Sequence, residues 1–169
     1  MAARNAAQRT DEWFKARDGK LTASVIAALF KSHPFSTVTD VIEILDGSNK
    51  KNDNGVTNKK LNFAMNWGTL FEDHAVKRYE EVVGTKTTET GFWAVEHPPL
   101  MQQTSCYEGV PFCGGSPDRL IPEYKPEDGL GILEMKSPHS KKYPQPIQKN
   151  MYHVFQLVMN MFATGAKWG

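Results

Sequence analysis

A change in the apolar pattern along the chain constrains the fold more than any other feature of the sequence. In the first half, apolar side chains recur at the spacing of amphipathic helices, over residues 10–18, 22–31, 38–46 and 67–83. Residues 85–136 instead alternate aromatic and β-branched side chains with Gly and Pro breaks, which predicts three or four strands, the clearest over 130–135. A last helical pattern covers 147–164 and ends at Gly165. This order predicts an α/β or α+β fold, with a central mixed sheet flanked by helices.

The length of 169 residues indicates one domain, which we place over residues 1–169. Within it we expect a flexible arm at 1–9 and a mobile loop at 46–61, where Asn, Lys, Gly and Asp gather. Residues 166–169 resemble the approach to a further strand. That ending is consistent with either a naturally short protein or a truncated one.

Composition excludes several classes of protein. The net charge is +1, so a nucleic-acid partner would have to be bound by a local basic patch. The two cysteines, Cys106 and Cys113, are too few for a disulfide framework or for a zinc site built only of thiolates. No apolar run approaches the ~18 residues of a membrane helix, and residues 1–9 lack the apolar stretch of a signal peptide. We therefore expect an intracellular, soluble protein with no membrane partner.

The clearest predicted strand ends in an acidic and a basic residue that share one face. Side chains at i and i+2 of a strand point to the same side, so Glu134 and Lys136 project together. Asp118, after a Gly-Gly-Ser-Pro turn, would supply a second carboxylate. Two carboxylates suit Mg²⁺ or Mn²⁺, and Lys136 could orient or activate a water molecule. The alternative is an exposed salt bridge between Glu134 and Lys136.

Glu72 is a third carboxylate that could complete a metal site. On a helix it shares a face with Val76, Tyr79 and Val83, which we expect to point toward a core. Thr69 and Glu72 also have the Thr-x-x-Glu spacing of a capping box, in which Glu72 would be purely structural. The spacing leaves both interpretations open.

The last predicted helix carries a polar stripe among apolar residues. Tyr152, Gln156 and Asn160 recur at i, i+4 and i+8. Buried amides need hydrogen-bond partners, so this stripe could face a catalytic cleft and bind the attacking water. The alternative is an ordinary polar edge that faces solvent.

Near the N-terminus, Arg17 and Ser24 could bind a terminal phosphate. Arg17 precedes a turn at Gly19, and Ser24 would lie in the first turn of a helix, where free N–H groups and the helix dipole attract anions. The alternative is simple helix capping by Thr22 or Ser24, together with a surface arginine.

These segments, in this order, resemble the lambda-exonuclease-like (YqaJ-type viral recombinase) branch of the PD-(D/E)XK nucleases. The resemblance runs from residue 12 to 165 and rests on Trp13-Phe-Lys-Ala-Arg17 through Leu21-Thr-Ala-Ser24, Gly68-Thr-Leu-Phe-Glu72, Gly115-Ser-Pro-Asp118, Leu133-Glu-Met-Lys-Ser-Pro138 and Tyr152 to Gln156. Two positions depart from the family pattern: Arg119, where many relatives have Gly, and Ser137, where the family has Cys. Neither departure removes an expected metal ligand.

The resemblance implies a role for the matched residues. Two Mg²⁺ or Mn²⁺ ions would be bound by Asp118, Glu134 and Glu72. Lys136 would activate the attacking water, helped by Gln156, and Tyr152 belongs to the same last motif. A 5′ phosphate would be held by Arg17, Ser24, Ser116 and Lys142.

The function that the resemblance implies is a Mg²⁺-dependent exonuclease in viral or phage-type recombination or DNA processing. It would digest one strand of duplex DNA from a 5′-phosphorylated end and leave a 3′ overhang. Two alternatives remain: an endonuclease or structure-specific nuclease of the same fold, and a non-catalytic DNA-binding protein. The expected partners are double-stranded DNA ends, a single-strand annealing protein and further copies of the chain, since some relatives form trimers. The expected location is the cytoplasm or, for a protein of a eukaryotic virus, the host nucleus or cytoplasm.

Overall fold

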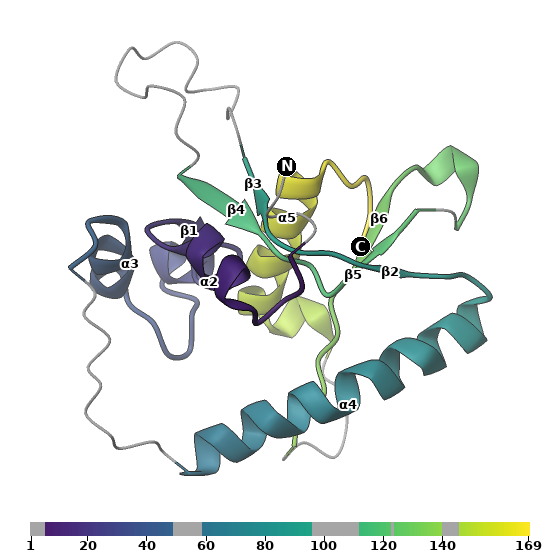
Figure 1. The fold of residues 1–169 in the computed structure, drawn as a ribbon, viewed down its shortest axis with the longest axis horizontal. Helices are drawn as coiled ribbons and strands as arrows, with labels where there is room; N and C mark the ends of the chain where they lie inside the picture. The colour runs from purple at the N-terminus through teal and green to yellow at the C-terminus, as the bar shows by residue number, and fades with distance from the viewer. Residues whose placement is uncertain (1–5, 49–58, 96–111, 123, 140–145) are drawn as a thin grey trace.

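The computed structural model describes residues 6–48, 59–95, 112–122, 124–139 and 146–169, and in it a mainly helical first half is followed by most of the strands and then by a last helix (Figure 1). The α-helices are α2 (Asp11–Arg17), α3 (Val38–Leu45), α4 (Lys59–Val83) and α5 (Met151–Thr164). The 3₁₀-helices are η1 (Ile26–Phe30), η2 (Pro126–Asp128) and η3 (Ile147–Lys149). The strands are β1 (Leu21–Thr22), β2 (Thr88–Glu89), β3 (Trp93–Ala94), β4 (Cys113–Gly115), β5 (Arg119–Ile121) and β6 (Gly131–Leu133).

The strands form two three-stranded sheets that meet at the short connection between β4 and β5. In the first sheet, β4 lies between β1, to which it runs parallel, and β3, to which it runs antiparallel. In the second sheet, β5 lies between β2 and β6 and runs antiparallel to both. Pro117 lies in the connection and has no N–H to donate to a continuous ladder. The mixed sheet is therefore divided at the place where Ser116 and Asp118 lie.

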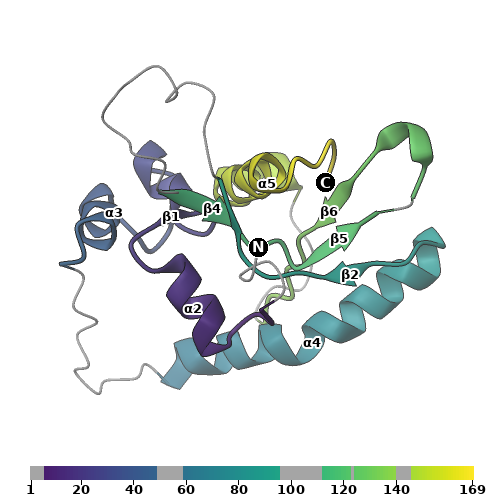
Figure 2. The ribbon, with the colours of Figure 1, turned by 45° about the horizontal axis from the view of Figure 1, so that its top comes forward.

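Helix α5 packs across both sheets at the centre of the molecule (Figure 1, Figure 2). It contacts β3 and β4 of the first sheet, β6 of the second sheet, and η1. Phe30 of η1 stacks on Phe155 of α5, with the ring centroids 4.4 Å apart. Because α5 touches both sheets, its side chains reach the junction between them.

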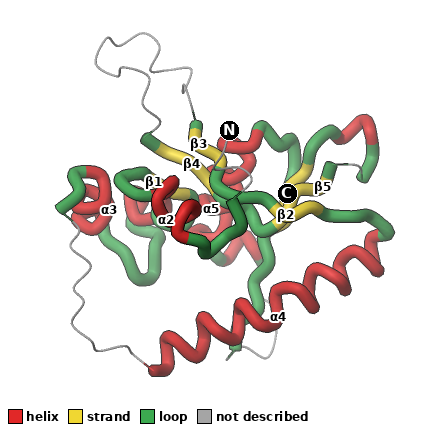
Figure 3. Tube along the Cα trace, in the orientation of Figure 1, coloured by secondary structure: helices red, strands yellow, loops and turns green. Residues whose placement is uncertain are grey.

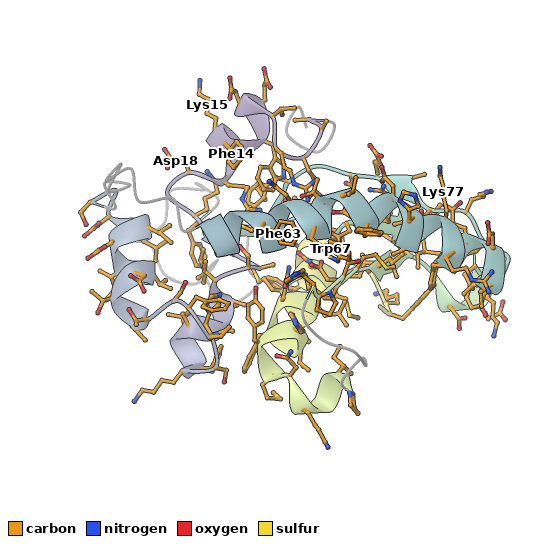
Figure 4. All side chains as sticks on the ribbon, turned by 90° about the horizontal axis from the view of Figure 1, so that it is seen from below. Phe14, Lys15, Asp18, Phe63, Trp67 and Lys77 are labelled. Carbon is orange, nitrogen blue, oxygen red and sulfur yellow. The ribbon has the colours of Figure 1, made fainter. Side chains whose placement is uncertain are left out.

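Helix α4 runs along one edge of the molecule, beside the two sheets (Figure 3). Phe63 and Trp67 lie along the first half of this helix (Figure 4). The Trp67 ring is tilted against Phe71, with centroids 4.2 Å apart, and His139 lies edge-on to Phe63 at 4.9 Å. Aromatic contacts thus join α4 to the segment that follows β6.

The predicted mixed α/β architecture with flanking helices is confirmed. Helices α4 and α5 end at Gly84 and Gly165, which adopt the positive φ angles of +72° and +76° that glycine allows. The approach to a further strand that residues 166–169 indicate is also present, since Trp168 pairs with Gly131 in a parallel bridge. A membrane-spanning helix would need length and apolar character together, and no helix within the described ranges has both.

The helix predicted over 22–31 is shorter than expected. Leu21 and Ala23 donate their backbone N–H groups to the carbonyl oxygens of Phe112 and Gly114, so this stretch belongs to the sheet. Only η1 is helical. Local spacing could not reveal the change, because β4 comes much later in the chain.

The helix predicted over 67–83 begins earlier than expected, at Lys59. Thr69 therefore lies inside α4, and its hydroxyl donates to the carbonyl oxygen of Met65 at 3.1 Å. The capping-box alternative for Glu72 is wrong for this reason. In the loop predicted over 46–61, residues 49–58 lie outside the described ranges and 59–61 begin α4.

Candidate active site

The two carboxylates predicted near the strands meet where the sheets join. Asp118 immediately precedes β5, and Glu134 immediately follows β6. Oδ2 of Asp118 accepts a hydrogen bond from the backbone N–H of Met135 at 2.6 Å. This bond ties the connection after β4 to the end of β6, so Asp118 and Glu134 belong to one site.

Glu134 is held by three side chains. Lys136 Nζ and Gln156 Nε2 donate to its Oε1 at 2.5 and 2.6 Å, and Asn160 Nδ2 donates to its Oε2 at 2.8 Å. The Glu134 side chain is only 8% exposed, so its pair with Lys136 is not the exposed salt bridge of the alternative interpretation. Gln156 and Asn160 are buried as well, which shows that the polar stripe of α5 faces this site and not solvent.

Electrostatics make the site favourable for a further cation. Burial raises the pKa of Asp118 from 3.8 to about 7, and the negative charge of Glu134 adds to the rise. Burial also raises the pKa of Glu134, although Lys136 counteracts part of the effect. Burial, the largest single effect, would lower the pKa of Lys136, but the attraction of Glu134, the hydrogen bond to it and the attraction of Asp118 together raise the pKa. Two buried carboxylates that share one ammonium group are a typical arrangement of a functional site.

The donor set of the site fits Mg²⁺ or Mn²⁺. Asp118 and Glu134 supply hard carboxylate oxygens. Oε1 of Gln156 is buried and has no hydrogen-bond partner among the described residues, so a further oxygen is available to an ion or to its water. Within the same part of the chain, no group of three or more His, Cys, Asp or Glu side chains is close enough to share an ion. The structure thus brings together two of the three predicted carboxylate ligands.

Glu72 lies near these carboxylates but contacts two arginines. Its Oε2 is 3.0 Å from Arg9 Nη2, and its Oε1 is 3.9 Å from Arg119 Nη1. Its negative charge contributes to the raised pKa values of Asp118 and Glu134, after the larger effect of burial. The three carboxylates therefore interact electrostatically, and the role of Glu72 as a metal ligand stays a prediction.

Arg17, Ser24 and Ser116 form a polar cluster beside the connection between β4 and β5. Arg17 Nη2 donates to Ser24 Oγ at 3.1 Å, and its guanidinium group lies over the ring of Trp13, 4.0 Å from the centroid. Trp13 Nε1 in turn donates to Ser116 Oγ at 3.0 Å. The N-terminal stretch that carries Trp13, Arg17 and Ser24 thus meets the connection between β4 and β5 two residues from Asp118.

Arg17 is a cation that no acidic side chain in the described ranges neutralises. Burial lowers its pKa from 12.5 to about 10. The N-cap of η1 is Val25 and makes no side-chain hydrogen bond, so the helix-capping alternative for Thr22 and Ser24 is wrong. A half-buried guanidinium group beside serine hydroxyls is well suited to an anion such as phosphate.

Two further residues that the sequence assigned to the site are Tyr152 and Lys142. Tyr152 lies on α5 and makes a small contribution to the raised pKa of Lys136. The Tyr152 ring lies edge-on to His33 at 4.7 Å, and His33 Nε2 is 3.0 Å from the carbonyl oxygen of Ser24. Lys142 lies outside the described residues.

Residues 12–167 match the family described as the YqaJ-like viral recombinase domain. The chain belongs to this family. Among curated proteins, none matched the chain.

The fold of this YqaJ-like domain is similar to solved structures of the alkaline exonuclease LHK-Exo. The structure of LHK-Exo in complex with dAMP is 27% identical with a TM-score of 0.61, and the match covers 93% of this chain and 70% of that chain. A second structure, of the alkaline exonuclease LHK-Exo from Laribacter hongkongensis, is 26% identical with a TM-score of 0.56 and the same coverage. The predicted family and the predicted fold class are therefore confirmed.

The structure gives contacts to residues for which the sequence indicated no specific partner. Asn160 bonds to Glu134, and its i+4 spacing from Gln156 is the signal that could have assigned it. Trp13 belongs to a recognised motif, but its position between Arg17 and Ser116 has no sequence signal. The approach of Arg9 to Glu72 likewise has none, because 63 residues separate them.

Gly115→Ala is expected to destabilise the YqaJ-like domain and to displace Asn160 from Glu134. A Cβ atom at residue 115 would overlap Asn160 Oδ1 and lie 3.1 Å from Asn160 Cα, so α5 would have to shift. Overpacking of this kind costs about 1–3 kcal/mol. Urea unfolding measures the change in the free energy of unfolding. Gly68→Ala on α4 is a matched control, because its Cβ would meet open space and alanine favours helix.

Proposed function

We propose that this YqaJ-like domain is a Mg²⁺-dependent deoxyribonuclease that hydrolyses phosphodiester bonds of duplex DNA from a 5′-phosphorylated end. Its setting would be viral or phage-type recombination or DNA processing. The observation that carries the proposal is the convergence of Asp118, Glu134 and Lys136 at the junction of the sheets, next to the Arg17 cluster. The family match and the similarity to structures of an alkaline exonuclease support the same class of reaction.

Each polar group of the site has a chemical task in this proposal. Asp118 and Glu134, with Glu72 as the further ligand, would hold Mg²⁺ or Mn²⁺, as two ions, whose chemistry is to polarise the phosphoryl group and ease deprotonation of water. Lys136 has a raised pKa, so it acts as an ammonium group that orients the attacking water and offsets charge on the phosphate. Gln156 helps to orient that water through its unpartnered Oε1.

The Arg17 cluster supports action at a phosphorylated end. A terminal phosphate is dianionic near neutral pH, whereas an internal diester carries one negative charge. Arg17 with the hydroxyls of Ser24 and Ser116 offers both charge and hydrogen bonds to such a group. Lys142, which lies outside the described residues, is the fourth residue that we assign to this phosphate.

Digestion of one strand from its 5′ end leaves the other strand single and ending in 3′. We therefore propose a single-strand annealing protein as the partner that receives this product. Assembly of several copies of the chain, such as a trimer around the duplex, would keep the enzyme on its DNA.

Digestion of a linear, end-labelled duplex in the presence of Mg²⁺ tests the proposal. We expect early release of a 5′-phosphate mononucleotide from the labelled 5′ end, loss of activity in EDTA, and no cleavage of closed circular DNA. Cleavage of the circle would favour an endonuclease. Binding of the duplex without any cleavage would favour a non-catalytic DNA-binding protein.

Arg17→Ala is expected to reduce the preference for 5′-phosphate over 5′-hydroxyl duplexes. Loss of a charge-assisted contact of this kind corresponds to about a 10- to 100-fold change. The ratio of kcat/KM on the two duplexes measures it. Lys15→Ala is the control, because Lys15 is an exposed cation on the same helix (Figure 4). An unchanged ratio in Arg17→Ala would remove this residue from the terminal-phosphate site.

A further inference from the structure

Arg119 is a largely buried residue that forms ion pairs with several carboxylates around the site. Its guanidinium group lies 2.9 Å from Asp73, 3.4 Å from Glu89 and 3.9 Å from Glu72, and also donates to the carbonyl oxygen of Asp118 at 3.0 Å. Its side chain is only 11% exposed. A guanidinium group with this many partners is fixed in place, because a change in its position would break several contacts at once.

The partners of Arg119 lie on separate elements. Glu72 and Asp73 belong to α4, Glu89 ends β2, and Arg119 itself begins β5 directly after Asp118. Arg119 therefore ties the helix that carries Glu72 to the strand that carries Asp118. Its positive charge pairs with Glu72, the carboxylate whose negative charge helps to raise the pKa values of Asp118 and Glu134.

Arg9 contacts the other oxygen of Glu72 and is held very differently. Its side chain is 52% exposed, and Glu72 is its ion-pair partner in the described part of the chain. The residue before it, Gln8, donates from Nε2 to the carbonyl oxygens of Pro117 at 2.9 Å and Thr90 at 3.3 Å. Gln8 thus docks the N-terminal segment against the connection that leads to Asp118.

The backbone and surroundings of Arg9 indicate that its ion pair with Glu72 can be replaced by another contact of Glu72. Arg9 adopts a φ of +68°, a left-handed conformation that costs a non-glycine residue about 1 kcal/mol. A cavity of about 410 Å³, lined by Arg9, Glu72 and Arg119 among others, provides space beside the pair. An exposed ion pair contributes little free energy, so a divalent cation can displace one guanidinium group from the carboxylate.

We propose that Arg9 and Arg119 are opposed positioning residues for Glu72. Arg119 holds Glu72 where its charge acts on Asp118 and Glu134, and so favours the binding of a divalent cation. Arg9 occupies the Glu72 carboxylate until such a cation replaces it, and so opposes binding. This inference rests on the proposed function, since it takes Glu72 as a ligand of the metal centre.

Calorimetric titration of Mn²⁺ into the metal-free protein, without DNA, tests the inference. Arg9→Gln is expected to tighten Mn²⁺ binding by about two- to fivefold, because the competing cation is gone. Arg119→Met is expected to weaken binding by about 10- to 100-fold, as loss of a group that orients a ligand does. Arg119→Lys should recover part of the loss. A purely structural role of either residue would not produce changes of opposite sign.

Matched variants test whether the changes in Mn²⁺ affinity depend on the contacts with Glu72. Arg78→Gln removes an exposed ion pair with Glu81 on the same helix and should leave Mn²⁺ affinity unchanged. In a Glu72→Gln background, Arg9→Gln should have no further effect on Mn²⁺ affinity. If Arg119→Met fails to fold, as circular dichroism would reveal, Arg119→Lys and Arg9→Gln still decide the matter.

Two negative results are distinguishable. Wild-type protein that binds Mn²⁺ while Arg9→Gln binds it equally or more weakly would overturn the inference and leave the proposed function standing. Wild-type protein that binds no Mn²⁺ and cleaves no DNA would overturn both.

Discussion

Asp118→Asn is expected to abolish Mg²⁺-dependent DNA cleavage and, at the same time, to make the metal-free protein more stable at alkaline pH. Loss of a carboxylate ligand removes several kcal/mol of transition-state stabilisation, which is about a thousandfold or more in rate. Asparagine has the same shape, and its Oδ1 can still accept the N–H of Met135. The fold is therefore expected to persist without the activity.

The gain in stability follows from the raised pKa of Asp118. The carboxyl titrates at about 7 in the folded protein and near 3.9 in an unfolded chain, so the folded state binds more protons between these values. Its contribution to folding stability is fully present below about pH 4 and is lost as the pH rises through about 7. At about pH 8 the ionised, buried Asp118 destabilises the metal-free protein by roughly 4 kcal/mol, which asparagine would relieve.

Urea unfolding in EDTA at about pH 5 and about pH 8 measures the effect. Wild-type protein should lose stability between the two conditions and regain it when Mg²⁺ is added. Asp118→Asn should show a smaller loss and no response to Mg²⁺. Asp128→Asn, at an exposed carboxylate in η2, is the control and should behave like wild type. An Asp118→Asn protein that still cleaves DNA, or that is less stable than wild type at alkaline pH, would contradict this account.

Local periodicity was sufficient to predict the parts of the site that lie on one element. The alternation of side chains along a strand predicted that Glu134 and Lys136 project together, and the structure pairs them at 2.5 Å although β6 ends at Leu133. Gln156 and Asn160 share a face because they are four residues apart on a helix, and both donate to Glu134. These relationships depend only on neighbours within a few residues.

Contacts between distant segments could not be derived in this way. The bond from Met135 to Asp118 joins residues 17 apart, and the Trp13–Ser116 bond joins residues 103 apart. Spacing could suggest which side chains are chemically suited to a site, but the resemblance to a nuclease family was needed to bring them together. The fold class was predictable because it depends on the order of elements and not on their contacts.

Two predictions of where a helix begins, at Thr69 and at Ser24, are wrong. Thr69 has the spacing of a capping residue, but α4 begins at Lys59 because the turns before Thr69 also form helix. Ser24 has the character of an N-cap, but sheet pairing of Leu21 and Ala23 moves the start of η1 beyond it. At Ser24 a sheet contact overrides a valid local signal, whereas Thr69 lies inside a helix that is longer than its own spacing predicted.

Lys136→Met is expected to lower the rate of cleavage by about 10²- to 10⁴-fold while metal binding persists. Methionine retains most of the aliphatic stem, and the Lys136 side chain is 39% exposed, so the fold should tolerate the change. Removal of the ammonium group also frees Oε1 of Glu134 from a competing cation, so Mn²⁺ affinity should be equal to or higher than that of wild type.

Single-turnover cleavage at saturating Mg²⁺, combined with Mn²⁺ calorimetry, separates the two effects. Asp118→Asn should lose both metal binding and cleavage, whereas Lys136→Met should lose cleavage alone. Lys149→Met, at an exposed lysine in η3, controls for loss of positive charge near α5. A single-turnover rate in Lys136→Met equal to that of wild type would exclude Lys136 from the chemical step, because its ammonium group would then serve only to neutralise Glu134 in the absence of metal.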